Sequence, residues 1–108
     1  MSYDQSYMEA IAAQLEGEVE IIYKKMFGAY GVFSAGKFFA IVSGKQLFIK
    51  PTESGRAFIK DPKEMPPYEG ANVYFLIEDP FANKDWLSEV VQLTVAELPK
   101  PKPRKKKK

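Results

Sequence analysis

The sequence predicts an α+β domain with a single antiparallel sheet packed against an N-terminal and a C-terminal helix. Two patterns lead to this prediction. Apolar residues recur at helical spacing near both ends of the chain, and the middle is rich in β-branched and aromatic residues separated by glycine-containing turns. Size and composition agree, since 108 residues with 45% hydrophobic and 28% charged side chains are typical of one globular domain.

The first helix is expected over residues 4–16, where apolar side chains form one stripe: Met8, Ile11, Ala12 and Leu15. Ser6 with Glu9, or Ser2 with Gln5, has the spacing of a capping box. Gly17 is a plausible end of the helix.

The extended region between residues 19 and 50 comprises these segments: Val19–Met26, Ala29–Ser34, Lys37–Ser43 and Gln46–Lys50. Ala35-Gly36 and Gly44-Lys45 have the composition of two-residue hairpin turns, so neighbouring segments must pair antiparallel. We expect a three-strand meander from this region and at least one later strand.

After Pro51, Thr52 is expected to cap a short helix that runs to about Lys60. Asp61-Pro62 and Pro66-Pro67 predict an irregular connection, and Val73–Ile77 reads as a further strand. Asn83 or Asp85 is expected to cap a last helix over Trp86–Leu98, whose best apolar stripe comprises Leu87, Val90, Val91 and Val95. A single sheet covered by helices on one face leaves the other face solvated or paired with another subunit.

The charge is divided between two parts of the chain. Seven of the 16 basic residues lie in the last nine positions, which leaves nine against all 14 acidic residues in residues 1–99. We therefore expect a folded domain over residues 1–99 with a charge of −5 and a disordered basic tail over residues 100–108. The groups that could contact phosphates are Lys100, Lys102, Arg104, Lys105, Lys106, Lys107 and Lys108.

The residue counts argue against an enzyme. Without cysteine or histidine the chain has no thiolate nucleophile, no zinc–cysteine site and no imidazole base. No catalytic residue, cofactor or metal is predicted.

Gly31 to Lys37 matches the start of a phosphate-binding loop, but Phe38 stands where Ser or Thr is needed and a strand follows, so a hairpin turn is the better interpretation. With no apolar run long enough to span a membrane and no visible signal peptide, we expect a cytoplasmic protein.

Glycines and aromatic residues are concentrated in Met26–Phe33. Gly28 and Gly31 permit a positive φ, a bulge or a close backbone approach, while Phe27, Tyr30 and Phe33 offer large contact area. Core packing and a partner-binding role are both compatible with this composition.

The segment Lys25-Met26-Phe27-Gly28-Ala29-Tyr30-Gly31-Val32-Phe33, followed by Leu47-Phe48-Ile49-Lys50, resembles the TfoX/Sxy N-terminal-domain family. The similarity continues through Gly55-Arg56-Ala57-Phe58 and Pro66-Pro67-Tyr68 to the basic tail. The resemblance implies an α+β domain with an antiparallel sheet and no catalytic residues. Two-domain members of the family regulate natural competence together with a cyclic-AMP-responsive transcription activator, and this chain stops where their second domain would begin.

The resemblance suggests a non-enzymatic regulatory or adaptor protein that binds a protein partner and forms a homodimer. Its signature or partner-surface residues would be Met26, Phe27, Gly28, Tyr30, Gly31, Phe33, Lys50, Gly55, Arg56 and Tyr68. Two other classes stay open. A nucleic-acid-associated protein would bind through the tail, with steep salt dependence that is lost when residues 100–108 are removed. A small-molecule binder or enzyme would use a sheet-side pocket lined by Tyr23, Tyr30, Arg56, Tyr68 and Tyr74.

Overall fold

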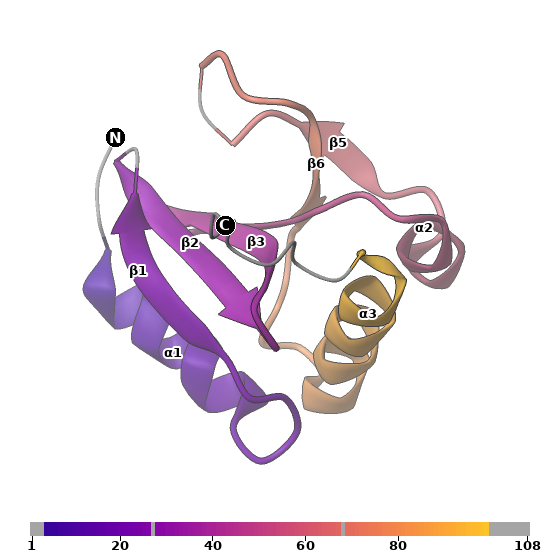
Figure 1. Cartoon of the computed structure of the whole chain (residues 1–108), viewed down its shortest axis with the longest axis horizontal. Helices are drawn as coiled ribbons and strands as arrows, with labels where there is room; N and C mark the ends of the chain where they lie inside the picture. Colours follow the sequence, from indigo (N-terminus) through magenta and orange to yellow (C-terminus); the bar gives the residue numbers. More distant parts are fainter. Residues whose placement is uncertain (1–3, 27, 68, 100–108) are drawn as a thin grey trace, which may run out of the picture.

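The computed structural model describes residues 4–26, 28–67 and 69–99, and it has the predicted α+β architecture (Figure 1). The strands are β1 (Ile22–Met26), β2 (Ala29–Ser34), β3 (Lys37–Ser43), β4 (Gln46–Ile49), β5 (Lys63–Met65) and β6 (Tyr74–Ile77). They form one antiparallel sheet in the order β1-β2-β3-β4-β6-β5. The helices are α1 (Gln5–Leu15), α2 (Glu53–Ile59) and α3 (Lys84–Glu97).

The sheet is larger than the sequence predicted. The meander has four strands, β1 to β4, joined at the expected turns, and its first strand begins at Ile22 and not at Val19. The predicted irregular connection contains a short strand, β5, which pairs with β6 from Lys63 to Met65. Three exposed residues between prolines show no alternation of apolar and polar side chains, so only the pairing with β6 identifies this strand.

Both capping-box predictions for α1 were placed at the wrong residues. The helix begins after Asp4, whose carboxylate accepts a hydrogen bond from the Tyr7 backbone N–H at 2.9 Å. Ser6 therefore lies inside the first turn, and Ser2 is outside the described residues. Lys45 donates to the same carboxylate at 2.7 Å, and these two hydrogen bonds hold the pKa of Asp4 below its ordinary value. The expected caps of the other helices, Thr52 and Asn83, are confirmed.

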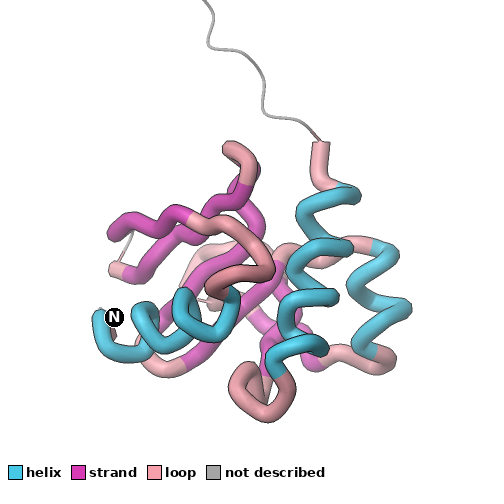
Figure 2. Tube along the Cα trace, turned by 90° about the horizontal axis from the view of Figure 1, so that it is seen from below, coloured by secondary structure: helices cyan, strands magenta, loops and turns pink. Residues whose placement is uncertain are grey.

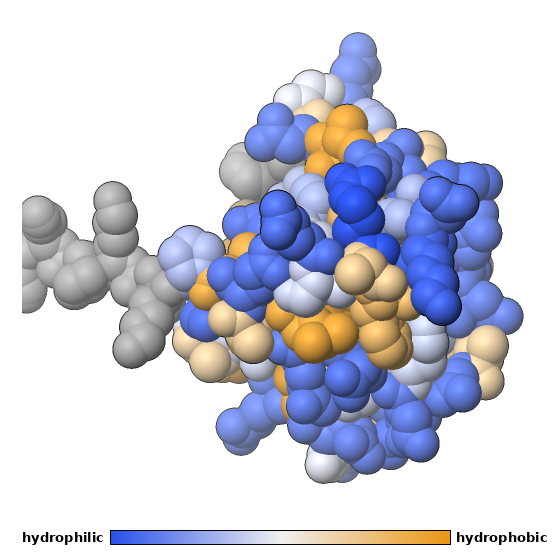
Figure 3. All heavy atoms as spheres, turned by 90° about the vertical axis from the view of Figure 1, so that its right-hand side faces the viewer, coloured by the Kyte–Doolittle hydropathy of each residue, from blue (hydrophilic) through white to orange (hydrophobic). Residues whose placement is uncertain are grey.

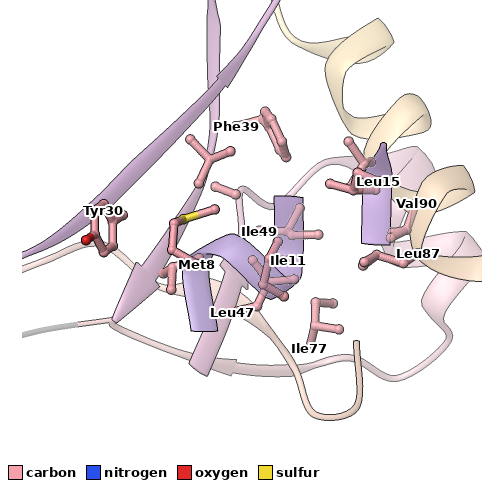
Figure 4. Packing of buried hydrophobic residues seen from close by; sticks show 14 residues of the cluster. Met8, Ile11, Leu15, Tyr30, Phe39, Leu47, Ile49, Ile77, Leu87 and Val90 are labelled. Atoms are coloured by element: carbon pink, nitrogen blue, oxygen red, sulfur yellow. The ribbon is translucent and has the colours of Figure 1, made fainter. Parts of the chain in front are cut away.

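The helices cover one face of the sheet. Register places Tyr30, Val42, Leu47 and Ile77 in one row across β2, β3, β4 and β6. This row packs with Met8, Ile11 and Leu15 of α1 and with Leu87, Val90 and Val91 of α3 in the main core (Figure 4). The predicted stripes were correct in outline, except that Thr94 is fully buried in α3 whereas Val95 is only half-buried.

The opposite face of the sheet carries a second, smaller cluster. Ile41, Phe48 and Leu76 form a row across β3, β4 and β6, and they pack with Ala29, Tyr74 and Phe38. No helical residue belongs to this cluster in the described part of the chain. Phe48 is nevertheless only 1% exposed. We call this side of the sheet the helix-free face.

Helices α2 and α3 lie side by side and are joined at their ends (Figure 2). The carboxylate of Glu97, in the last turn of α3, accepts hydrogen bonds from the backbone N–H groups of Glu53 and Ser54 at 3.0 and 2.9 Å, and from the Ser54 hydroxyl. Glu97 thereby supplies partners for N–H groups that a helix N-terminus leaves unpaired. The Ser54 hydroxyl and these two N–H groups lower the pKa of Glu97.

Substituting Glu97→Gln is expected to destabilise the protein at neutral pH, and the difference from wild type should shrink in acid. The folded pKa lies below the ordinary value of 4.5, so the stabilisation by the carboxylate is present above that value and disappears as the pH falls through the folded pKa. Urea unfolding at neutral pH and at successively lower pH values measures the difference. Glu89→Gln, an exposed position of the same helix, is the matched control. A difference that stays constant or grows in acid would contradict this account of the cap.

Candidate functional site

The signature segment forms the β1–β2 hairpin at one end of the sheet (Figure 1). Gly28 adopts a φ of 77° between the two strands, a conformation that glycine takes at little cost. Tyr30 points toward the helices, where it is 4% exposed and meets Tyr23 edge to face at 5.6 Å. Tyr30 is therefore a core residue. Phe27 and Tyr68, two further signature residues, lie outside the described residues.

Gly31 leaves room for two neighbouring side chains on the helix-free face. A Cβ atom at this position would stand 2.2 Å from the Met26 sulfur and 3.2 Å from the Phe38 ring. Gly31 thus allows the Met26 side chain to lie across β2. The bulge that we expected near the signature glycines lies slightly later, between Val32 and Phe33 in the β2–β3 pairing.

Gly55 and Arg56 belong to the packing between α2 and its neighbours. A Cβ atom on Gly55 would stand 2.8 Å from the Thr52 hydroxyl and 3.5 Å from that of Thr94 in α3. The Arg56 guanidinium lies 5.1 Å from the centre of the Phe75 ring and forms an ion pair with Glu64 at 2.6 Å. These two signature residues therefore connect α2 to α3 and to the β5–β6 edge.

The remaining signature residues contribute to a row of exposed and half-buried side chains on the helix-free face. The Lys24 ammonium lies 5.3 Å from the centre of the Phe33 ring, and the Phe33 and Phe38 rings are 5.2 Å apart. The Lys50 ammonium lies 4.9 Å from the centre of the Phe38 ring. We call these four residues, Lys24, Phe33, Phe38 and Lys50, the aromatic–lysine row.

The aromatic–lysine row has the chemistry of a recognition surface. Aromatic rings offer large contact area, and an ammonium group above a ring is attracted to its π electrons while it keeps hydrogen-bonding capacity for a partner. Lys24 and Phe38 were not among the predicted site residues. Neither β1 nor β3 shows a regular alternation of exposed and buried residues that would have singled them out. Pairing of Phe33 with Phe38 across β2 and β3, and the contacts of the two ammonium groups with these rings, show that the four side chains are neighbours.

The tyrosines proposed for a sheet-side pocket do not converge. Tyr30 belongs to the core on the helix side, with Tyr23 packed against it, whereas Tyr74 belongs to the cluster on the helix-free face. Arg56 lies on α2 against Phe75. The predicted constellation is therefore split by the sheet itself.

A cleft of about 480 Å³ lies elsewhere, where the α2–β5 connection meets the end of β6 and the start of α3. Its lining includes Ile59, Lys60, Asp61, Leu76 and Trp86. Lys60 and Asp61 both have a positive φ, 64° and 55°, which is uncommon for residues with a Cβ atom. Figure 3 shows apolar side chains gathered among hydrophilic ones on the side of the molecule that carries α2.

Among residues 4–26, 28–67 and 69–99, no group of three or more acidic side chains could hold a metal ion, and no helix is both long and apolar enough to cross a membrane. The basic tail predicted to contact phosphates, residues 100–108, lies outside the described part of the chain.

The fold is that of a small α+β domain, in which three helices cover one side of a six-stranded antiparallel sheet and the helix-free face forms the other side. The chain belongs to the TfoX N-terminal domain family, whose model matches residues 13–98. A protein of Spirochaeta aurantia, described as an uncharacterized 12.7 kDa protein in the 5′ region of trpE, is 31% identical over 107 residues. That similarity covers 99% of this chain and 93% of the relative.

Proposed function

We propose that this protein is a regulatory adaptor that binds a protein partner through the helix-free face of its sheet and acts in transcription control. Its family suggests a regulatory, competence-like role and is not known for enzymatic activity. The observation that supports a binding role most directly is the aromatic–lysine row, which lies on the side of the sheet without helical cover.

The row also indicates the chemistry of the partner. Two ammonium groups stand at the ends of a pair of adjacent aromatic rings. A partner surface with an apolar or aromatic side chain between carboxylates would match this pattern, because the rings supply contact area and the lysines pair with the acidic groups. The remainder of the folded domain is acidic, so the row offers local positive charge on an otherwise negative body.

The experiment is complementation of a deletion strain, with the transcript profile as the readout. Deletion should change a limited set of transcripts, and the wild-type gene should restore them. Lys50→Glu and Phe38→Ala should fail to restore them although both proteins accumulate in folded form. Lys84→Glu, the same charge reversal at an exposed position of α3, is the control and should restore the profile.

Each alternative result has a definite meaning. An unchanged transcript profile after deletion would refute a role in transcription control. Restoration by Lys50→Glu and by Phe38→Ala as fully as by wild type would show that the helix-free face is not the working surface. Circular dichroism of the purified variants checks that loss of function does not arise from unfolding.

A further inference from the structure

Strand β1 is an open edge of the sheet. It pairs with β2 on one side, and no described strand pairs with its other side. Ile22, the first residue of the strand, is 70% exposed, the largest exposure among the large hydrophobic side chains described. An edge with unpaired backbone groups and an exposed β-branched side chain is a template for pairing with another strand.

The other edge strand, β5, is also unpaired on its outer side among the described strands, but it is shorter than β1, and its apolar residue Met65 is less exposed than Ile22, 37% against 70%. Strand β5 has only three residues, and its charged side chains are already used: Glu64 pairs with Arg56 at 2.6 Å and Lys63 with Glu78 at 2.8 Å. Pro66 and Pro67 follow directly. Short length, engaged charges and proline are the devices by which proteins block an edge strand. The contrast singles out β1 as the edge available for association.

A cleft lies beside β1 on each of the two faces of the sheet. Val19, Ile21 and Tyr23 pack toward the helices and line a cleft of about 410 Å³ beside α1. Ile22 and Lys24 line a second cleft, of about 580 Å³, together with Phe33. A strand added at this edge would alternate its side chains between these two clefts.

The charge along this segment runs from acidic to basic. Glu16, Glu18 and Glu20 precede the strand, and Lys24 and Lys25 end it. In an antiparallel pair of identical strands, the acidic start of one copy faces the basic end of the other at both ends of the interface. A parallel pair would bring like charges together. The segment is therefore complementary to itself in the antiparallel direction.

We propose that two copies of this chain associate through antiparallel pairing of their β1 strands, which joins their sheets into one continuous sheet. This association is independent of the proposed regulatory function. In the register that we infer, Ile22 faces its counterpart across the two-fold axis, Ile21 faces Tyr23, and Glu20 faces Lys24. Apolar contact then lies at the centre of the interface, with an ion pair on each side of it.

The backbone of β1 is compatible with this register. The Ser34 hydroxyl donates to the Glu20 carbonyl at 2.8 Å, so the polar groups of Glu20 face β2. Because backbone polar groups alternate along a strand, those of Ile21 and Tyr23 face the open edge. The Ile21–Tyr23 pairs can thus exchange hydrogen bonds, while the two Ile22 residues form the closer, non-hydrogen-bonded pair. A register centred on Tyr23 would instead place Lys24 against Ile22.

Engineered cysteines test the register directly, because the chain contains no native cysteine. Residues opposite each other in a non-hydrogen-bonded pair have Cα atoms about 4.5 Å apart, which is within reach of a disulfide. Ile22→Cys should therefore give a disulfide-linked dimer under mild oxidation. Lys24→Cys is the matched control, since its counterpart would lie about 13 Å away along the strand, and it should stay mostly unlinked.

Charge reversal tests the ion pairs in solution by sedimentation equilibrium of the full chain. Glu20→Lys or Lys24→Glu alone should raise the dimer Kd by about tenfold, because each places like charges opposite each other twice. The double variant Glu20→Lys/Lys24→Glu should return the Kd to near the wild-type value. Glu89→Lys, on α3, should leave it unchanged.

Three results would overturn the proposal. A wild-type chain that stays monomeric up to hundreds of micromolar would leave no self-association to explain. A dimer that forms but ignores the single charge reversals would use another surface. Cross-linking of Lys24→Cys as efficient as that of Ile22→Cys would exclude this register. None of these measurements involves a protein partner or the transcript profile, so their failure is distinct from failure of the proposed function.

Discussion

Replacing Phe48 with alanine is expected to lower the free energy of unfolding by about 3–5 kcal/mol. Phe48 lies in the central strand β4, is 1% exposed, and stands between Ile41 and Leu76 in the row on the helix-free face. Truncation removes most of a buried aromatic side chain and leaves a cavity between Ile41 and Leu76. This cavity cannot easily close, because the strands that carry these two residues are held in place by their pairing with β4. Since small domains are stable by about 5–15 kcal/mol, this substitution removes a large share of the total.

Urea unfolding followed by the fluorescence of Trp86, the single tryptophan, measures this loss. Phe81→Ala is the matched control because it removes the same group from a side chain that is 43% exposed. The Phe81 ring meets Tyr7 edge to face, and more than two fifths of its side chain stays exposed, so its loss should cost about 1 kcal/mol. A similarly small cost for Phe48→Ala would mean that the cluster on the helix-free face is not a second core.

Gly55→Val is expected to lower the free energy of unfolding by about 2–4 kcal/mol. The new side chain would meet the Thr52 hydroxyl, which caps α2 by accepting a hydrogen bond from the Gly55 N–H at 3.0 Å, and the buried Thr94 of α3. It would separate α2 from α3 and disturb the cap, so overpacking and cap loss add. The tightest contact is with the Thr52 cap of α2 itself, and the neighbouring Thr94 of α3 limits the space that remains for a larger side chain.

Ala57→Val introduces the same side chain into the same helix at an exposed position and controls for helix propensity. Its cost should stay near 0.5 kcal/mol, the intrinsic penalty of valine relative to alanine. Thermal unfolding of both variants beside wild type makes the comparison. Equal costs for the two variants would show that α2 and α3 can move apart freely at Gly55.

Local sequence signals located most of the secondary structure. Helical spacing identified the buried faces of α1 and α3, and two-residue turns placed three hairpin-connected strands in sequence. The cap of α1 was misplaced because serine–glutamate spacing is common in helices, whereas the cap is completed by Asp4 and by a distant lysine, Lys45. Strand β5 was missed because its three residues become a strand only when β6 lies beside them.

The candidate site depended more strongly on tertiary structure. The signature glycines and aromatic residues of the β1–β2 hairpin were recognisable in the chain, but the same string contains a core tyrosine, Tyr30, and a half-buried aromatic residue, Phe33, on the other face of the sheet. Whether a side chain is buried in the main core or remains accessible depends on which face of the sheet the helices cover. Lys50 and Phe38 become neighbours only through the pairing of their strands.

The sequence by itself determined the fold class, the family, the absence of cysteine and histidine, and the concentration of basic residues in the last nine positions, because each follows from composition or from patterns within a few neighbouring residues. Tertiary structure alone decided which sheet face stays free of helices, that Glu97 caps α2, and that β1 forms an open edge. These depend on contacts between residues far apart in the chain, and local propensity carries no information about which distant segments meet.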